Sequence, residues 1–139
     1  MITPKKPSVL DACALIAFLQ DEEGADVTED ALTDSSRDNY VHAINLCEMY
    51  YHFWRQDNQA TAEAAVATVM GFGVAVREDM DAAFWRQVGR HKVLTQPLSL
   101  GDCCCLALVE RLRAELVTSD HREFDPVAAL GLCPILFIR

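Results

Sequence analysis

Several signatures of common enzyme classes are missing from this chain of 139 residues. It lacks the glycine-rich motifs of nucleotide-binding folds, the G-x-S-x-G turn and a Ser-His-Asp order. Its four histidines share no spacing typical of metal ligands. The apolar runs are far too short to cross a bilayer, so we expect no membrane partner. The chemistry of this chain must therefore come from other residue types.

The six cysteines lack the spacing of disulfides or zinc sites. No C-x-x-C pair occurs, and Cys103, Cys104 and Cys105 are consecutive. Free cysteines behave as small buried apolar residues, and we expect that role here. Unpaired thiols favour a reducing compartment, which predicts a cytoplasmic protein.

Basic residues are scarce, with 12 Lys and Arg against 21 Asp and Glu, a net charge of −9. Residues 21–38 alone carry eight acids and one arginine, or −7, which leaves −2 for the rest of the chain. A broad basic face is therefore absent, but RNA contact remains permitted. The candidate RNA-binding residues are Arg86, Arg90, Lys92 and Arg122.

Strand-like and helix-like segments alternate along the chain. This alternation predicts one α/β domain over residues 1–139, with a central, mainly parallel sheet between two helical layers. The segment 21–38 is expected to be partly helix and partly loop, and 120–125 a short turn. Strands are expected at 8–10, 40–43, 74–76, 115–118 and 135–138, and helices at 12–19, 45–56, 59–70, 80–92 and 100–113.

Four acidic residues are predicted to meet at one edge of this sheet. Asp11 and Asp120 follow apolar strands, and Glu48 and Asp102 lie in the first turns of helices. Ligands of open parallel sheets bind beyond the carboxyl ends of the strands. Four converging carboxylates repel one another, and Mg²⁺ or Mn²⁺ is the simplest ion to hold them together.

Each acid also has a local structural interpretation. Asp11 is placed to cap a helix, and Asn45-x-x-Glu48, Ser99-x-x-Asp102 and Asp120-x-x-Glu123 resemble capping boxes. Capping and metal coordination are compatible, because the helix dipole favours a charged carboxylate at an N-terminus. Thr118 and Ser119 either orient a carboxylate or form a local turn, and the sequence leaves both open.

Together these segments resemble PIN-domain ribonucleases, especially VapC-type toxins of toxin–antitoxin pairs. The likeness lies in Ser8-Val-Leu-Asp11, Asn45-Leu-Cys-Glu48, Leu98-Ser-Leu-Gly-Asp102 and Leu116-Val-Thr-Ser-Asp120 with Phe124. It implies an α/β/α PIN fold and an endoribonuclease that hydrolyses RNA with a water activated by Mg²⁺ or Mn²⁺. It also implies a homodimer and inhibition by a small antitoxin.

By motif position, the resemblance makes Asp11, Glu48, Asp102 and Asp120 the catalytic metal ligands, supported by Asn45, Thr118 and Ser119. Two features depart from the family pattern. Cys13 stands where Ser or Thr is usual, and the 21–38 segment is unusually acidic. These departures favour an alternative, a PIN-like module that binds a protein or RNA partner with little catalysis. A phosphatase or receiver domain fits less well, because the acidic pairs that those sites need are missing.

Overall fold

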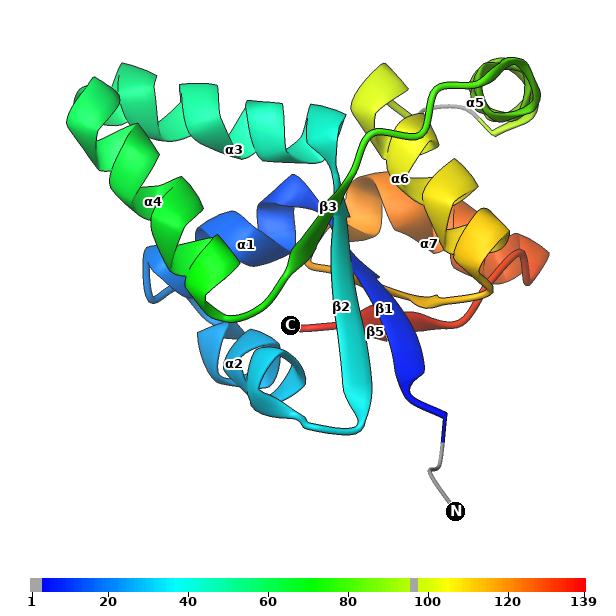
Figure 1. Cartoon of the computed structure of the whole chain (residues 1–139). Helices are drawn as coiled ribbons and strands as arrows, with labels where there is room; N and C mark the ends of the chain where they lie inside the picture. The colour runs from blue at the N-terminus through cyan, green and yellow to red at the C-terminus, as the bar shows by residue number, and fades with distance from the viewer. Residues whose placement is uncertain (1–3, 96–97) are drawn as a thin grey trace.

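The computed structural model describes residues 4–95 and 98–139, and within them the chain forms a five-stranded parallel sheet (Figure 1). The strand order is β3-β2-β1-β4-β5, with β1 in the centre. Every strand pairing is parallel, so the carboxyl ends of the strands share one edge. The strands are β1 (Lys6–Leu10), β2 (Arg37–His42), β3 (Ala75–Arg77), β4 (Glu115–Thr118) and β5 (Ile135–Phe137).

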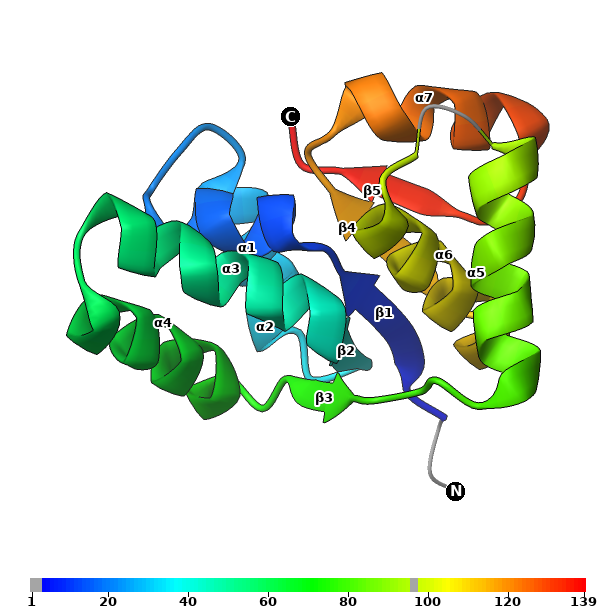
Figure 2. The ribbon, with the colours of Figure 1, turned by 90° about the horizontal axis from the view of Figure 1, so that it is seen from above.

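Helices cover both faces of the sheet (Figure 2). One layer contains α1 (Ala12–Leu19), α2 (Ala25–Thr33), α3 (Ala43–Gln56) and α4 (Gln59–Gly71). The other contains α5 (Ala82–Leu94), α6 (Leu100–Leu112) and α7 (His121–Leu130). The predicted three-layer α/β/α architecture is confirmed.

Alternating side chains of the central strands build a separate core on each face. Val9 and Leu116 pack with α5, α6 and α7, whereas Leu10 and Val117 pack with α1, α3 and α4. All four side chains are fully buried. Apolar burial on both faces explains why β1 and β4 are continuous apolar runs.

The register of the two central strands positions the acidic edge. Leu10 of β1 lies beside Val117 of β4, so the chain leaves both strands at the same level. Asp11 directly follows β1, and its backbone N–H donates to the carbonyl of Val117. The helices α1 and α7 then begin at this same edge, on opposite faces of the sheet.

Two sequence-based expectations about local structure were wrong. Residues 120–125 are not a short turn, because they open α7, which continues through Pro126 to Leu130. Asn45 does not begin α3 either. His42 caps that helix, its Nδ1 accepting from the Ile44 N–H at 3.1 Å. The 21–38 segment contains α2 and the first residues of β2. The predicted mixture of helix and loop is therefore correct in part, because the segment also begins a strand.

All six cysteines are free thiols. Cys103, Cys104 and Cys105 are buried in α6, as expected, but Cys13 and Cys47 are exposed, so for these two the expected burial was wrong. Within the described ranges, no helix combines the length and the apolar character that a bilayer-spanning segment needs.

Candidate metal site

Asp11 is the most deeply buried acid at the carboxyl edge of the sheet. It is 1% exposed and caps α1, its Oδ1 accepting from the Ala14 N–H at 2.8 Å. Its Oδ2 accepts a short hydrogen bond from the Thr118 hydroxyl. The Thr118 hydroxyl thus makes both contacts that the sequence left open, one to this carboxylate and one within a local turn. The same hydroxyl oxygen also accepts from the Asp120 N–H at 3.0 Å, so Thr118 links the two acids.

The pKa of Asp11 is raised to about 7, mainly by burial and to a smaller extent by the charges of Asp120 and Glu48. The hydrogen bonds from Thr118 and Ala14 act in the opposite direction, because they favour the charged form. The carboxyl group is thus buried beside like charges that it can tolerate only when it is protonated or when a cation neutralises it.

Asp102, Asp120 and Glu123 form the tightest group of acids. One carboxylate oxygen from each lies within 4.8 Å of the others. Asp120 caps α7 by accepting from the Glu123 N–H at 3.0 Å, and Ser99 caps α6 by accepting from the Asp102 N–H at 3.2 Å. The Ser99 N–H donates in turn to Glu123 Oε2 at 3.2 Å. The two capped helix ends therefore hold these three acids together.

Glu123 was missed as a site residue by the sequence reasoning. The Asp120-x-x-Glu123 spacing was interpreted only as a capping box, and the capping contact is indeed present. Its side chain, however, points back to Ser99 on the neighbouring helix and joins Asp102. The available signal was that a second acid follows Asp120 by one helical turn.

Glu48 reaches the site from α3. Burial raises its pKa, and the charge of Glu123 raises it further. A side chain on Gly101 would overlap the Glu48 carboxylate, since a Cβ built there meets Oε1 and lies 2.9 Å from Cδ. Asn45 holds the same two helices together by donating from Nδ2 to the Gly101 carbonyl at 2.9 Å. Buried Asn45 Oδ1 has no hydrogen-bond partner among the described residues.

The donor set suits a hard divalent cation. The atoms brought together are carboxylate oxygens, the ligands that Mg²⁺ and Mn²⁺ prefer. Burial, with the charges of neighbouring acids as a smaller cause, raises the pKa of Asp11 and of Glu48, so a bound cation would favour the charged form of both carboxylates. Asp102, Asp120 and Glu123, with Asp11 and Glu48 beside them, are thus able to hold such an ion.

Cys13 lies in the first turn of α1, next to Asp11. Desolvation raises the pKa of its thiol to about 12, and the charges of Asp11 and Asp120 add to the effect. The thiol therefore remains neutral at physiological pH. Ser119, between Thr118 and Asp120, makes no side-chain hydrogen bond with the described part of the chain.

The candidate RNA-binding residues lie on two helices. Arg86, Arg90 and Lys92 belong to α5, and Arg122 lies on α7 between Asp120 and Glu123. Arg86 stacks over Trp85 at 4.6 Å, and Lys92 donates to the Leu98 carbonyl at 2.7 Å. Arg122 is thus the candidate nearest in the chain to the acids.

Comparison with known proteins identifies the fold family. The family model described as the PIN domain matches residues 8–130. The chain belongs to the PIN-domain family. No curated protein sequence matches it. The resemblance inferred from the four acidic motifs is thereby confirmed.

Solved structures similar to this PIN domain include toxin–antitoxin proteins. VapBC2 from Rickettsia felis bound to a promoter DNA fragment has a TM-score of 0.71 and 12% identity, covering 94% of this chain and 98% of the other. DNA-bound VapBC from Salmonella typhimurium has a TM-score of 0.70 and 17% identity, covering 99% and 100%. VapC20 from Mycobacterium tuberculosis, described as a toxin that cleaves the sarcin–ricin loop, has 0.69 and 16%, covering 88% and 94%. These likenesses establish a shared fold.

Proposed function

We propose that this PIN domain is a divalent-metal-dependent endoribonuclease and the toxin of a type II toxin–antitoxin pair. The observation that carries the proposal is the convergence of Asp102, Asp120 and Glu123 to within 4.8 Å, beside Asp11. A bound Mg²⁺ or Mn²⁺ would supply charge stabilisation for the phosphate and a more acidic water for hydrolysis. The metal-binding fold and the oxygen-only donor set support this assignment.

The side chains divide the work between holding the ion and positioning the reacting groups. Asp102, Asp120 and Glu123 would bind the cation, with Asp11 held toward them by Thr118. The Glu48 carboxylate reaches from α3 to lie against Gly101, where it would orient the attacking water and accept its proton. Burial and the charge of Glu123 raise its pKa, which makes the carboxylate a stronger proton acceptor than an exposed glutamate.

The test is RNA cleavage by the purified protein with Mg²⁺ or Mn²⁺ and after chelation. Asp11→Asn and Asp102→Asn should abolish cleavage, while asparagine preserves the capping ability of position 11. Asp125→Asn is the matched control, because Asp125 is exposed on α7 and pairs with His121 instead. Cleavage that persists in EDTA and in both site variants would refute the mechanism.

Partners and location follow from the same proposal. VapBC structures pair a toxin with its antitoxin, and we infer a small antitoxin for this chain, a homodimeric assembly and a cytoplasmic location. The substrate class is RNA, in line with the printed description of VapC20. A small open reading frame just upstream that encodes a DNA-binding protein would support the pairing.

A second candidate function is a PIN domain that binds a partner without useful catalysis. Cys13 favours it, because a neutral thiol replaces the hydroxyl that the family usually has beside Asp11. Calorimetric titration with Mn²⁺ separates the two functions. Absence of heat at millimolar Mn²⁺, together with stable antitoxin binding, would support the binding module and contradict the nuclease.

A further inference from the structure

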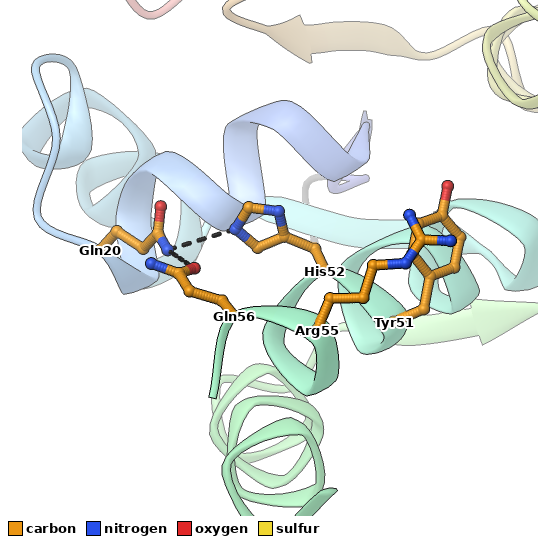
Figure 3. Close-up of a pocket in the computed structure, with 5 residues that line it drawn as sticks. All are labelled: Gln20, Tyr51, His52, Arg55 and Gln56. Carbon is orange, nitrogen blue, oxygen red and sulfur yellow. Dashed lines mark hydrogen bonds between the residues drawn. The ribbon is translucent and has the colours of Figure 1, made fainter. Parts of the chain in front are cut away.

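A polar pocket lies outside the acidic site, between the end of α1 and the last turns of α3 (Figure 3). It has a volume of about 310 Å³. Arg55 and Tyr51 lie together on one side, Gln20 and Gln56 on the other, and His52 between them. None of these five residues takes part in the proposed metal site.

Hydrogen bonding within the pocket leaves mostly donors unpaired. Gln20 Nε2 donates to Gln56 Oε1 and lies 3.2 Å from His52 Nε2. Because an amide nitrogen only donates, His52 Nε2 must accept, and the ring proton lies on Nδ1. Three donors thus remain for a ligand: the N–H of His52, the amide NH₂ of Gln56 and the guanidinium of Arg55. The other free polar groups are the carbonyl of Gln20, which accepts, and the hydroxyl of Tyr51.

Arg55 supplies a positive charge that its surroundings leave available. No carboxylate lies within salt-bridge distance of it in the part of the chain that the structure describes. Its guanidinium stacks over the Tyr51 ring at 4.8 Å. The neighbouring acids have other contacts, because Glu22 pairs with Arg139 and Asp57 accepts from Thr61. Arg55 is therefore able to pair with an external anion.

The pocket lies in line with the acidic edge. Glu48, His52 and Arg55 occupy positions i, i+4 and i+7 of α3, on one face of the helix. At 1.5 Å per residue, His52 and Arg55 lie about 6 Å and about 10 Å beyond Glu48 along the axis. The helix α1 starts at Asp11 and ends beside the same pocket. An RNA strand that crosses the acidic edge is therefore able to reach the donors of the pocket.

We propose that this pocket binds a backbone phosphate of the RNA strand whose cleaved phosphate lies at the acids, through Arg55, His52 and Gln56. The proposal rests on the proposed nuclease function. The stacked pair of Arg55 and Tyr51 offers a flat face for an adjoining base, as do aromatic and arginine platforms in single-strand binding sites. A carboxylate of a protein partner could accept from the same donors, but it would not stack on the Arg55–Tyr51 pair.

The test measures RNA binding without cleavage. A short fluorescent single-stranded RNA is titrated in EDTA, and Kd is followed by anisotropy over a range of salt concentrations. Arg55→Gln should weaken binding about tenfold and reduce the log–log salt slope by about 0.7. Tyr51→Leu should weaken it less, because it removes the aromatic ring of the stacking face but keeps the positive charge of Arg55. With metal added, Arg55→Gln should raise KM and leave kcat largely intact.

Arg113→Gln is the matched control, with the same charge change at the end of α6, near the amino edge of the sheet. Equal Kd values and equal slopes for Arg55→Gln and Arg113→Gln would overturn the proposal. It would also be overturned if Arg55→Gln weakened binding of a glutamate-rich peptide but not of RNA. If wild type binds RNA in EDTA but fails to cut it with Mn²⁺, and only Arg55→Gln weakens the binding, the nuclease is contradicted and the pocket is supported. Wild type that cuts RNA, with no effect of Arg55→Gln on Kd or KM, contradicts the pocket alone.

Discussion

At the scale of single residues, the acids of the proposed metal site also make hydrogen bonds that stabilise the fold. Asp11 caps α1 with one oxygen and accepts from Thr118 with the other, while its burial raises its pKa to about 7. Asp120 caps α7 and joins Asp102 and Glu123. The sequence predicted that capping and coordination are compatible in one side chain, and the capping contacts of Asp11 and Asp120 are present. Substitutions at Asp11 and Gly101 can separate the structural contribution of these acids from their proposed role in cleavage.

Asp11 should make the metal-free protein less stable as the pH rises. Its folded pKa of about 7 exceeds the ordinary value of 3.8, so the folded state favours the protonated acid. That contribution is complete below pH 4 and is lost as the pH rises through 7; the shift corresponds to at most about 4 kcal/mol. Melting temperatures in EDTA should fall between pH 5 and pH 8 for wild type and fall less for Asp11→Asn. Parallel curves for the two proteins would show that Asp11 does not titrate there.

Gly101→Ala should damage activity without damaging the fold. A Cβ at Gly101 would displace the Glu48 carboxylate, which ends a flexible side chain. Alanine also favours helix formation by up to about 1 kcal/mol over glycine. We expect an unchanged or higher melting temperature in EDTA and a loss of cleavage of about 100-fold, since a displacement of about 1 Å is often that costly.

Gly89→Ala is the control for this substitution, because its Cβ would meet no atom within 4 Å in the middle of α5. It should gain the same helical stability and keep full activity. Full activity in Gly101→Ala would show that cleavage does not depend on the present position of Glu48.

At the scale of helices and strands, the sequence was most informative where apolar patterns decide the structure. Buried strands such as Val9-Leu10 and Leu116-Val117 were predictable because both sheet faces are covered. The length of α7 was not predicted, because 120–125 were expected to form only a short turn although Asp120-x-x-Glu123 was recognised as a capping box. The approach of Glu123 to Asp102 depends on how α6 and α7 pack, through the Ser99–Glu123 hydrogen bond. No local pattern encodes such a contact between helices.

Glu123→Gln should remove metal binding and leave the junction of α6 and α7 intact. Glutamine keeps an oxygen for the Ser99 N–H, and the Glu123 backbone still donates to Asp120. Wild type should gain about 2.7 kcal/mol at a Mn²⁺ concentration a hundredfold above Kd, which raises the melting temperature by several degrees. The variant should melt like wild type in EDTA and gain much less with Mn²⁺. Asp125→Asn should respond to Mn²⁺ like wild type, and an equal gain in Glu123→Gln would exclude Glu123 as a ligand.

At the scale of the whole molecule, negative charge occurs on two separate surfaces. The site acids lie at the carboxyl edge of the sheet, whereas the 21–38 segment leaves that edge along α2 and reaches the amino edge at the start of β2. Several of its acids are occupied: Glu22 pairs with Arg139, and Asp34 with Ser36 and Arg37. Asp26, Glu29 and Asp30 remain exposed on α2, with no ion pair among the described residues. The order of charge along the chain did not reveal this division.

The exposed acids of α2 should accelerate the association of a basic partner, whereas competition between that partner and Mn²⁺ should depend only on the site acids. Complementary charge raises association rates and makes them sensitive to salt. We expect a short arginine peptide, or the antitoxin, to bind a variant carrying Asp26→Asn, Glu29→Gln and Asp30→Asn more slowly at low salt and with a shallower salt dependence. Mn²⁺ should still compete with the peptide in this variant, because the site acids at the other edge are unchanged.

In Asp102→Asn, by contrast, the salt dependence should persist while the competition with Mn²⁺ weakens. Stopped-flow association at several ionic strengths measures both effects, and identical salt slopes for wild type and the α2 variant would show that this face is only solvated.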